Sequence, residues 1–243
     1  PSSLMHIYLI EAGPRLLAGM SEESSAHAEQ FLREMGVNIL LNKRVVDYRD
    51  HKVVLEDGTE IATRTFIWVS GVTGVTIGNL DASLIGRGGR IKVDSFNRVE
   101  GMNNVFAIGD QCIQLADENY PNGHPQLAQV AIQQGELLAK NLVRMEKGRE
   151  MKPFHYRNLG SMATVGRNRA VAEFSKVKMQ GWFAWVMWLV VHLRSILGVR
   201  NKVIVLLNWV WNYFTYDQSM RMIVYVRKAK EIRDREKVEA TTH

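Results

Sequence analysis

The residue in this sequence that is best placed for chemistry is an acid at the end of an apolar run. In the stretch NNVFAIGDQC the run Val105 to Ile108 stops at Gly109-Asp110. Such a run predicts a strand, and an acid placed after a terminal glycine is usually directed at a bound partner. The alternative for Asp110 is an ordinary helix cap or loop acid.

Side-chain amides form a second candidate group. Gln126, Gln129 and Gln133 form an i, i+3, i+7 row on the predicted helix HPQLAQVAIQQGELLAKNLVRME, so they share one helix face. Rows of glutamine are usually solvated. The other, apolar face is predicted from residues at helical spacing: Leu127, Val130, Ala131, Gln134, Leu138 and Leu142.

The cysteine content limits the chemistry. Cys112 is the only cysteine among 243 residues. One cysteine excludes a disulfide framework, a four-cysteine metal site and a CxxC redox pair, and it fits a reducing compartment. A thiol-dependent flavin reductase is therefore disfavoured. The start, PSSLMHIYLIEAG, has no initiator Met and no basic region typical of a signal peptide, and we expect the sequence to begin inside a domain.

The charge of the chain is divided unevenly along its length. Residues 1–150 hold 15 Lys and Arg against 19 Asp and Glu, a net charge of −4, whereas residues 151–243 hold 16 against 6, a net charge of +10. A basic C-terminal part suggests an anionic partner, either nucleic acid or a lipid surface.

The first block, residues 1–77, reads as part of an α/β unit. MHIYLIEAG predicts a buried strand, SEESSAHAEQFLREMG a helix capped by Ser21 and closed by Gly36, and VNILL a second strand. RVVDYRDHKVVLEDGTEI then alternates with period two around Asp57-Gly58, which is typical of a hairpin. RTFIWVSGVTG follows as another apolar run.

Two further blocks follow. Residues 78–150 predict a strand, a loop and the long glutamine-bearing helix. Residues 151–243 begin with a predicted hairpin that turns at Gly166-Arg167-Asn168, and continue with GWFAWVMWLVVHLRSILGV, VIVLLNWVWNYFTY and a charged tail. No GxGxxG fingerprint occurs, and GRGGR, residues 86–90, does not have the spacing.

VFAIGD, AQVAIQQG, NLGSMATVGRNRAVAEF and LLNWVWNYFTYD together resemble the C-terminal part of type II NADH dehydrogenases, single-subunit flavoprotein NADH:quinone oxidoreductases of respiratory membranes. The resemblance covers essentially the whole chain. It implies an α/β, partial two-dinucleotide-binding fold, Rossmann-like and similar to pyridine nucleotide-disulfide oxidoreductases. It also implies the later half of an NADH-binding domain at 1–77, the return segment of an FAD-binding domain at 78–150, and a membrane-association region at 151–243. Because both glycine fingerprints of that family are missing, we expect a C-terminal portion of such an enzyme.

The resemblance assigns the flavin contacts. Asp110 would accept hydrogen bonds from the ribityl hydroxyls of FAD. The segment Ala128, Gln129, Val130 and Ala131 would pass below the flavin ring, with the positive helix N-terminus facing its C2 carbonyl, where it would stabilise the anionic reduced flavin.

The resemblance also assigns the substrate contacts. Glu11, at the end of a Rossmann strand, would bind the adenine ribose hydroxyls of NADH and repel the extra phosphate of NADPH, although an ordinary strand-end acid is the alternative. Gly71 would leave room for the nicotinamide to stack on the flavin. Gln129 and Gln133 would orient the quinone head group by hydrogen bonding, and not by proton transfer; a solvated amide row is the alternative.

The last two apolar runs are too interrupted by polar residues to cross a bilayer, which requires about 20 predominantly apolar residues. Their aromatic content with nearby basic residues predicts helices that lie in the lipid interface, as a peripheral membrane-docking region. The alternative is a buried helical hairpin. The predicted membrane residues are Trp182, Trp185, Trp209 and Trp211, and the basic residues are Lys176, Lys178, Arg194, Arg200 and Lys202. Nucleic acid is disfavoured because the basic residues accompany aliphatic runs.

The resulting interpretation is the C-terminal part of a peripheral, non-proton-pumping NADH:quinone oxidoreductase on the cytoplasmic face of the bacterial inner membrane. Its expected ping-pong reaction passes hydride from NADH to FAD and then electrons and protons to a membrane quinone, with no metal. A homodimer through the C-terminal region and an anionic lipid surface are the expected partners. The alternative is a non-catalytic module that binds lipid and self-associates.

Overall fold

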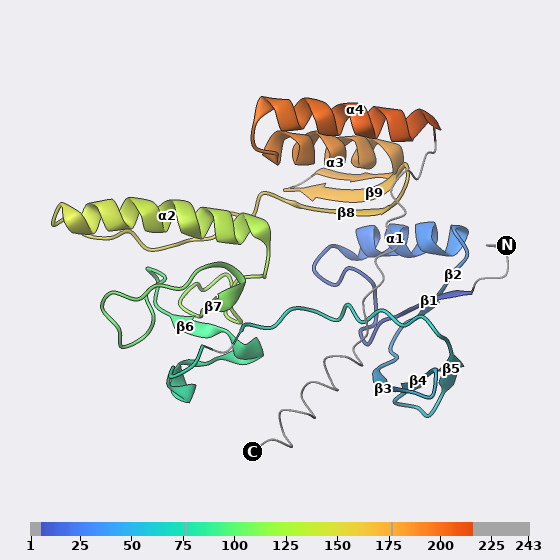
Figure 1. The fold of residues 1–243 in the computed structure, drawn as a ribbon, viewed down its shortest axis with the longest axis horizontal. Coiled ribbons are helices and arrows are strands. Elements are labelled where there is room, and N and C mark those ends of the chain that lie inside the picture. The colour runs from blue at the N-terminus through green and yellow to red at the C-terminus, as the bar shows by residue number, and fades with distance from the viewer. Residues whose placement is uncertain (1–5, 76, 176, 216–243) are drawn as a thin grey trace, which may run out of the picture. The chain divides into compact units, whose positions relative to one another are not determined.

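The chain begins with a strand, helix and strand arrangement. Strands β1 (Ile7–Ile10) and β2 (Val37–Leu40) pair in parallel, and helix α1 (Glu22–Glu34) connects them (Figure 1). Parallel neighbours require such a crossover. The Ser21 side chain accepts a hydrogen bond from Ser24 N at 3.3 Å, and Gly36, with φ of 83°, follows the helix end. The predicted order and both predicted helix boundaries are confirmed.

The computed structural model describes residues 6–75, 77–175 and 177–215. The chain divides into two units, residues 1–186 and 187–243, and each is described by itself.

The next three strands form an antiparallel sheet. Its strands are β3 (Val45–Arg49), β4 (Lys52–Leu55) and β5 (Glu60–Ala62), in the order β3-β4-β5. The predicted turn at Asp57-Gly58 joins β4 to β5. A second turn, at Asp50-His51, joins β3 to β4, and both of its residues have positive φ. This turn was missed because two-residue hairpin loops usually carry a glycine.

The apolar run RTFIWVSGVTG forms neither helix nor strand. Its side chains lie largely open, with Ile67 74% and Val69 84% exposed. Only its start packs on the preceding sheet, where the Phe66 ring stacks on Tyr48 with centroids 5.0 Å apart.

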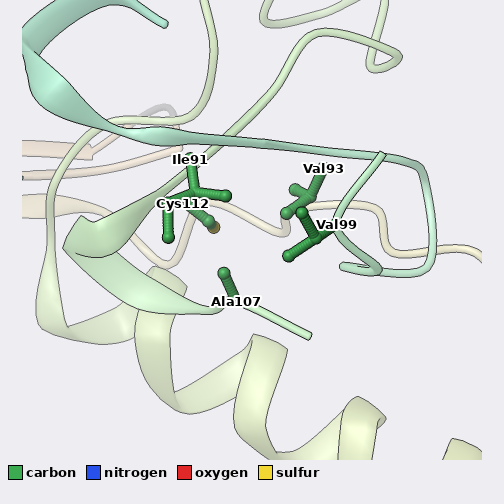
Figure 2. Packing of buried hydrophobic residues seen from close by; sticks show 5 residues of the cluster. All are labelled: Ile91, Val93, Val99, Ala107 and Cys112. Carbon is green, nitrogen blue, oxygen red and sulfur yellow. The ribbon is translucent and has the colours of Figure 1, made fainter. Parts of the chain in front are cut away.

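The second block has a small parallel pair at its centre. Strands β6 (Ile91–Val93) and β7 (Cys112–Gln114) pair in parallel, after the short 3₁₀ helices η2 (Ala82–Leu84) and η3 (Arg87–Gly89). Five buried side chains meet beside this pair, as Figure 2 shows: Ile91, Val93, Val99, Ala107 and Cys112.

The strand expected at Val105 to Ile108 is not present. The segment forms one isolated bridge, Phe106 to Arg98, and runs into the 3₁₀ helix η4 (Gly109–Gln111). A strand needs a continuous ladder of backbone partners, and the pairing of this segment consists of two hydrogen bonds, from Val99 N to Val105 O at 2.9 Å and from Ala107 N to Asn97 O at 3.0 Å. The acid Asp110 therefore follows an extended segment and not a paired strand.

Helix α2 (Ala128–Glu146) begins within AQVAIQQG as predicted. Val130 and Gln134 of the expected apolar face are buried, as predicted. The face differs in part, because Asn141 is buried as well and Leu127 and Leu142 are 41% and 47% exposed. Two of the three buried side chains are amides, so polar contacts hold much of this face.

A three-stranded antiparallel sheet follows. Its strands are β8 (Ser161–Gly166), β9 (Arg169–Phe174) and β10 (Val177–Gln180), in the order β10-β9-β8. The predicted hairpin turn at Gly166-Arg167-Asn168 is confirmed. Helix α1 packs against this sheet (Figure 1), and Glu173 Oε1 accepts a hydrogen bond from Ser21 N at 2.9 Å.

The last two helices of the described residues are α3 (Gly181–Ser195) and α4 (Val199–Thr215). The start of α3 packs on the β-sheet through Ala184, which lies against Ala170 and Ala172. Helix α4 has no buried residue. Among the described residues, no helix combines the length and apolar content that a bilayer crossing requires.

Candidate functional site

Asp110 lies in the middle of the η4 turn, next to the start of helix α2. Its side chain is exposed, and its main-chain oxygen accepts a 3.4 Å hydrogen bond from Gln126 Nε2. Gly109 has φ of 66°, and a Cβ built on it would lie 3.2 Å from Ala131 Cβ. Glycine is required here for the backbone conformation, and it also permits the close approach of the turn to α2.

The N-terminus of α2 faces this turn without a side-chain cap. Its N-cap residue is Leu127, which offers no side-chain acceptor, and no side-chain hydrogen bond caps the helix. The first N–H groups of a helix have no partner within the helix, and they carry its partial positive charge. An exposed carboxylate beside an open helix start is a suitable place for a ligand that has both hydroxyl donors and a carbonyl or anionic group.

The side chain of Gln134, from helix α2, holds the Gly109–Gln111 turn by a hydrogen bond. Its buried Oε1 accepts a hydrogen bond from Gly109 N at 2.7 Å, and its Nε2 lies 3.6 Å from Cys112 Sγ. Burial raises the pKa of the Cys112 thiol, which keeps it protonated near neutral pH. The sequence placed Gln134 on the apolar face of the helix but gave it no role, although a polar residue on that face was a usable signal.

Glu11 directly follows β1, which belongs to a different sheet from β7, the strand after Asp110. Its backbone is fixed to the end of β2, because Glu11 N donates to Leu40 O at 2.9 Å. Its carboxylate turns back and accepts a hydrogen bond from Gly13 N at 2.7 Å through Oε1. One oxygen is thus used to hold the side chain at the strand end.

Gly71 lies in the open segment after Val69. It has φ of 94°, and a Cβ built on it would meet nothing within 4 Å. Gly71 N donates to Val69 O at 3.0 Å, which forms a tight turn. Glycine is needed here because of the positive φ, and the space that a side chain would occupy is open.

The predicted quinone residues hold a returning segment of the main chain. Gln129 accepts from Leu159 N and donates to Gly160 O, both at 3.1 Å. Gln133 accepts from Arg157 N at 3.1 Å and donates to Arg157 O at 2.9 Å. The two amides are therefore not merely a solvated row, since each makes two hydrogen bonds to backbone.

Asn141 continues the same pattern two turns along α2. It accepts from Lys152 N and donates to Lys152 O, both at 2.9 Å. We call Gln129, Gln133 and Asn141 the amide clamp. The clamp fixes residues 152–160 along α2, and the segment leads into β8.

A buried histidine and acid lie in the loop before α2, and sequence reasoning missed both. His124 Nε2 lies 3.0 Å from Asp117 Oδ2, with side chains 1% and 3% exposed. The His124 hydrogen bond holds the pKa of Asp117 below its usual range. Tyr120, Phe154 and Tyr156 surround the His124 ring. Lone acids and histidines in loops carry no periodicity, so no pattern predicted this pair.

The four tryptophans predicted at the membrane fall into two pairs. Trp182 and Trp211 are 49% and 63% exposed. Trp185 packs against the buried alanine cluster of the β8–β10 sheet, and Trp209 lies against Trp188, with centroids 6.3 Å apart. The first pair is therefore exposed, and the second pair is only partly exposed.

The basic residues predicted beside these helices also differ in their surroundings. Lys178 Nζ lies 3.0 Å from Glu23 Oε2, so its charge is paired with α1. Lys176 and the charged tail after residue 215 lie outside the described residues.

These features define the class of protein. The sequence matches the pyridine nucleotide-disulphide oxidoreductase family over residues 2–135, more than half of the chain, and the chain belongs to that family. Residues 158–216 match the NDH2 C-terminal domain. The predicted fold class is thereby confirmed.

The relatives give a finer likeness. The chain is 35% identical to the type II NADH:quinone oxidoreductase NdhA of Mycobacterium tuberculosis over 216 residues, which are 84% of this chain and 44% of that protein. It is 32% identical to an internal alternative NAD(P)H-ubiquinone oxidoreductase A1, mitochondrial, of Arabidopsis thaliana, over 86% of this chain and 44% of that protein. The chain therefore spans a little under half the length of these relatives. The resemblance to type II NADH dehydrogenases is confirmed.

Solved structures support the fold. The NDH2 of Plasmodium falciparum in complex with NADH has a TM-score of 0.77 at 18% identity, covering 87% of this chain and 58% of that chain. The sulfide:quinone oxidoreductase of Aquifex aeolicus has a TM-score of 0.63 at 16% identity, covering 87% and 54%. At such identities the likeness concerns the fold alone.

Proposed function

We propose that this chain supplies the flavin-ribityl, nicotinamide and quinone contacts of a peripheral NADH:quinone oxidoreductase. The observation that carries the proposal is the exposed Asp110 carboxylate beside the uncapped start of α2. Ionised carboxylates accept strong hydrogen bonds from hydroxyls, and open helix starts favour negative charge. When bound, FAD would accept hydride from NADH and pass two electrons to quinone.

Asp110 would hold the ribityl hydroxyls, and Ala128 to Ala131 would lie below the flavin ring. Gly109 supports this assignment, since its lack of a side chain lets the acid-bearing turn approach Ala131. The chain's own residues would bind and orient the cofactor, and none of them needs to transfer a proton to it.

Glu11 and Gly71 would form the NADH side. The Gly13 hydrogen bond leaves one carboxylate oxygen of Glu11 for the adenine ribose hydroxyls. An ionised Glu11 would also repel the extra phosphate of NADPH, which favours NADH. Above Gly71 the open space would admit the nicotinamide ring.

Gln129 and Gln133 would line the quinone side. An amide oxygen can accept two hydrogen bonds and an amide nitrogen can donate two. Each side chain uses one of each on residues 157–160. One donor and one acceptor therefore remain to orient a quinone carbonyl, and no titratable group is involved.

The exposed faces of α3 and α4 would dock on an anionic lipid surface. Each face includes a largely exposed tryptophan, Trp182 and Trp211, and α4 buries none of its residues. Aromatic and aliphatic side chains on short interfacial helices, with Arg194, Arg200 and Lys202 nearby, fit the boundary of a bilayer. We further propose the cytoplasmic face of a bacterial inner membrane and a homodimer through this C-terminal region.

The test uses a flavin-loaded enzyme that contains this chain. Asp110→Asn should weaken FAD binding by about ten- to hundredfold, because a charged hydrogen bond contributes about 1.5–3 kcal/mol. The matched control is Glu118→Gln, an exposed acid elsewhere in the same block. Equal flavin retention by the two variants, measured by absorbance after dialysis, would contradict the assignment.

A second measurement tests the chain by itself, for which the alternative is a non-catalytic lipid-binding module, as the exposed α4 favours. We expect the 243-residue chain by itself to purify without stoichiometric FAD and to oxidise no NADH, because no glycine fingerprint supplies the backbone cradle for pyrophosphate. A yellow preparation of the chain alone would contradict this expectation.

A further inference from the structure

The GRGGR sequence, residues 86–90, has no role in the function proposed above. It contacts the extended segment 64–75, which carries Gly71 and which we call the connector. Gly74 N donates to Gly88 O at 2.7 Å. A Cβ built on Gly74 would lie 2.4 Å from Gly89 O, a distance that real Cβ atoms do not show. The two backbones therefore cross in direct contact, and glycine is needed for the crossing.

Gln111 holds the next residue of the same connector with both ends of its amide. Its Oε1 accepts from Val75 N at 3.0 Å, and its Nε2 donates to Val75 O at 2.6 Å. Val75 is 73% exposed, so its side chain contributes little packing. The backbone of the connector is thus held by the residue that directly follows Asp110.

Arg90 ties the GRGGR turn to the interior of the same block. Its buried guanidinium donates to Cys112 O at 2.6 Å through Nε and to His124 O at 3.1 Å through Nη2. Cys112 directly follows η4, the turn that holds Asp110. Hydrogen bonds therefore join the connector to the GRGGR turn at Gly74 and to the Asp110 turn at Val75. Arg90 joins the GRGGR turn to the residue that follows the Asp110 turn.

We propose that Gln111 is a positioning residue that, together with the Gly74 crossing, fixes the nicotinamide-side connector against the flavin-side acid. This inference rests on the proposed function for its meaning, since it links Gly71 to Asp110. Hydride transfer requires the two rings to be held in a narrow range of geometry, and small displacements lower its rate strongly. A connector held only by open side chains could not supply such a constraint.

The first test measures amide hydrogen exchange by NMR in the 243-residue chain without nucleotide. Gln111→Leu removes both hydrogen bonds, and the amide of Val75 should exchange about tenfold faster or more. Gln111→Glu retains an acceptor for Val75 N but sets its second carboxylate oxygen against Val75 O, so the Val75 amide should exchange faster than in wild type and more slowly than in Gln111→Leu. This order of exchange rates is a result that a general packing role would not give.

The exchange of Gly109 N is the internal control, because Gln134 and not Gln111 accepts its hydrogen bond. Faster exchange in Gln111→Leu at both Val75 and Gly109 would indicate a general loss of stability and would overturn the proposal. Unchanged exchange at Val75 would overturn it as well.

The second test compares a glycine substitution in the connector with one shortly after it. Gly74→Ala places a methyl group against Gly89 O, so the Val75 amide should lose protection even though Gln111 is intact. Gly78→Ala is the matched control, since it has ordinary φ and nothing within 4 Å of its Cβ. Equal exchange at Val75 in these two variants would overturn the proposal. Both tests lack flavin and NADH, so a failure of the proposed function would show instead in the FAD-binding comparison of Asp110→Asn with Glu118→Gln.

Discussion

Gln134 and Gly109 are joined by a 2.7 Å hydrogen bond in which the buried amide oxygen accepts from the glycine N–H. The bond holds a turn of positive φ directly against Ala131. The placement of Asp110 thus depends on the Gln134 side chain of α2 and on a glycine, without a side chain, at position 109 of the turn.

The missing side chain at Gly109 can be tested by stability. Gly109→Ala should lower the free energy of unfolding by about 1–3 kcal/mol, because the methyl group meets Ala131 in a backbone conformation that L residues rarely adopt. Gly101→Ala is the matched control, with φ of 74° and open space. Urea unfolding of both variants isolates the Ala131 contact, and equal midpoints would argue against it.

The Gln134 side chain can be tested by thiol chemistry. Gln134→Leu should cost about 1–3 kcal/mol, since the partly buried Gly109 N–H loses its acceptor. The same change removes an amide that contacts Cys112 Sγ. Reaction of the native protein with a thiol reagent should be slow and should become faster in Gln134→Leu. Identical labelling rates would mean that Gln134 does not close this site.

The Asp117 and His124 pair should make stability depend on pH. The pKa of Asp117 lies below its ordinary value of 3.8 in the folded chain. A group with a lowered folded pKa contributes stability above its unfolded pKa and loses it as the pH falls through the folded pKa. Asp117→Asn should therefore destabilise the protein at pH 7, and its difference from wild type should shrink below about pH 4. Denaturant midpoints from pH 7 to 3 check this, with Glu118→Gln as control, and a constant difference would contradict it.

Glu11 should set the preference between the two nicotinamide nucleotides. In a flavin-loaded enzyme that contains this chain, Glu11→Gln should reduce the ratio of kcat/KM for NADH over NADPH, because repulsion of the extra phosphate is lost. Each charged hydrogen bond to the ribose contributes about 1.5–3 kcal/mol. The glutamine oxygen can still accept from Gly13 N, so the local fold should be preserved. An unchanged ratio would leave Glu11 as an ordinary strand-end acid.

The exposed tryptophans should govern binding to vesicles. Trp182→Glu with Trp211→Glu should weaken co-sedimentation with anionic vesicles without unfolding the protein, because both side chains lie open. The basic residues should each add about 1 kcal/mol of attraction near the surface, weakened by salt. Trp185→Glu is the contrasting variant and should unfold the β8–β10 region, where its ring is packed. Equal sedimentation of wild type and the double variant would exclude these faces as the lipid contact.

Local patterns predicted most of the elements. The cap at Ser21, the turn at Asp57-Gly58 and the start of α2 all depend on nearest-neighbour chemistry, which a sequence displays directly. The strand expected at Val105 to Ile108 failed because strand pairing depends on residues outside the run, and here it consists of the single bridge from Phe106 to Arg98. An apolar run signals the need for a partner but not its presence.

The candidate site was predicted in part, and for the same reason. Asp110 and the α2 start were found through their motifs, whereas Gln111 and the His124–Asp117 pair were not, and Gln134 was expected on the apolar helix face but given no role. Each of these missed groups acts through contacts to residues elsewhere in the chain. Amides in particular are ambiguous in a sequence, because a solvated glutamine and a buried one look alike until the fold brings an acceptor or donor to them.

The amide clamp binds residues 152–160 through hydrogen bonds to their main-chain atoms alone. Apart from proline, every residue offers the same main-chain donor and acceptor, so these hydrogen bonds do not depend on which side chains Lys152, Arg157 and Leu159 carry. Within this segment only Phe154 and Tyr156 are buried, and the side chains of His155 and Arg157 are exposed. The segment beside the proposed quinone residues can therefore change the chemistry of its outer surface without losing its path along α2.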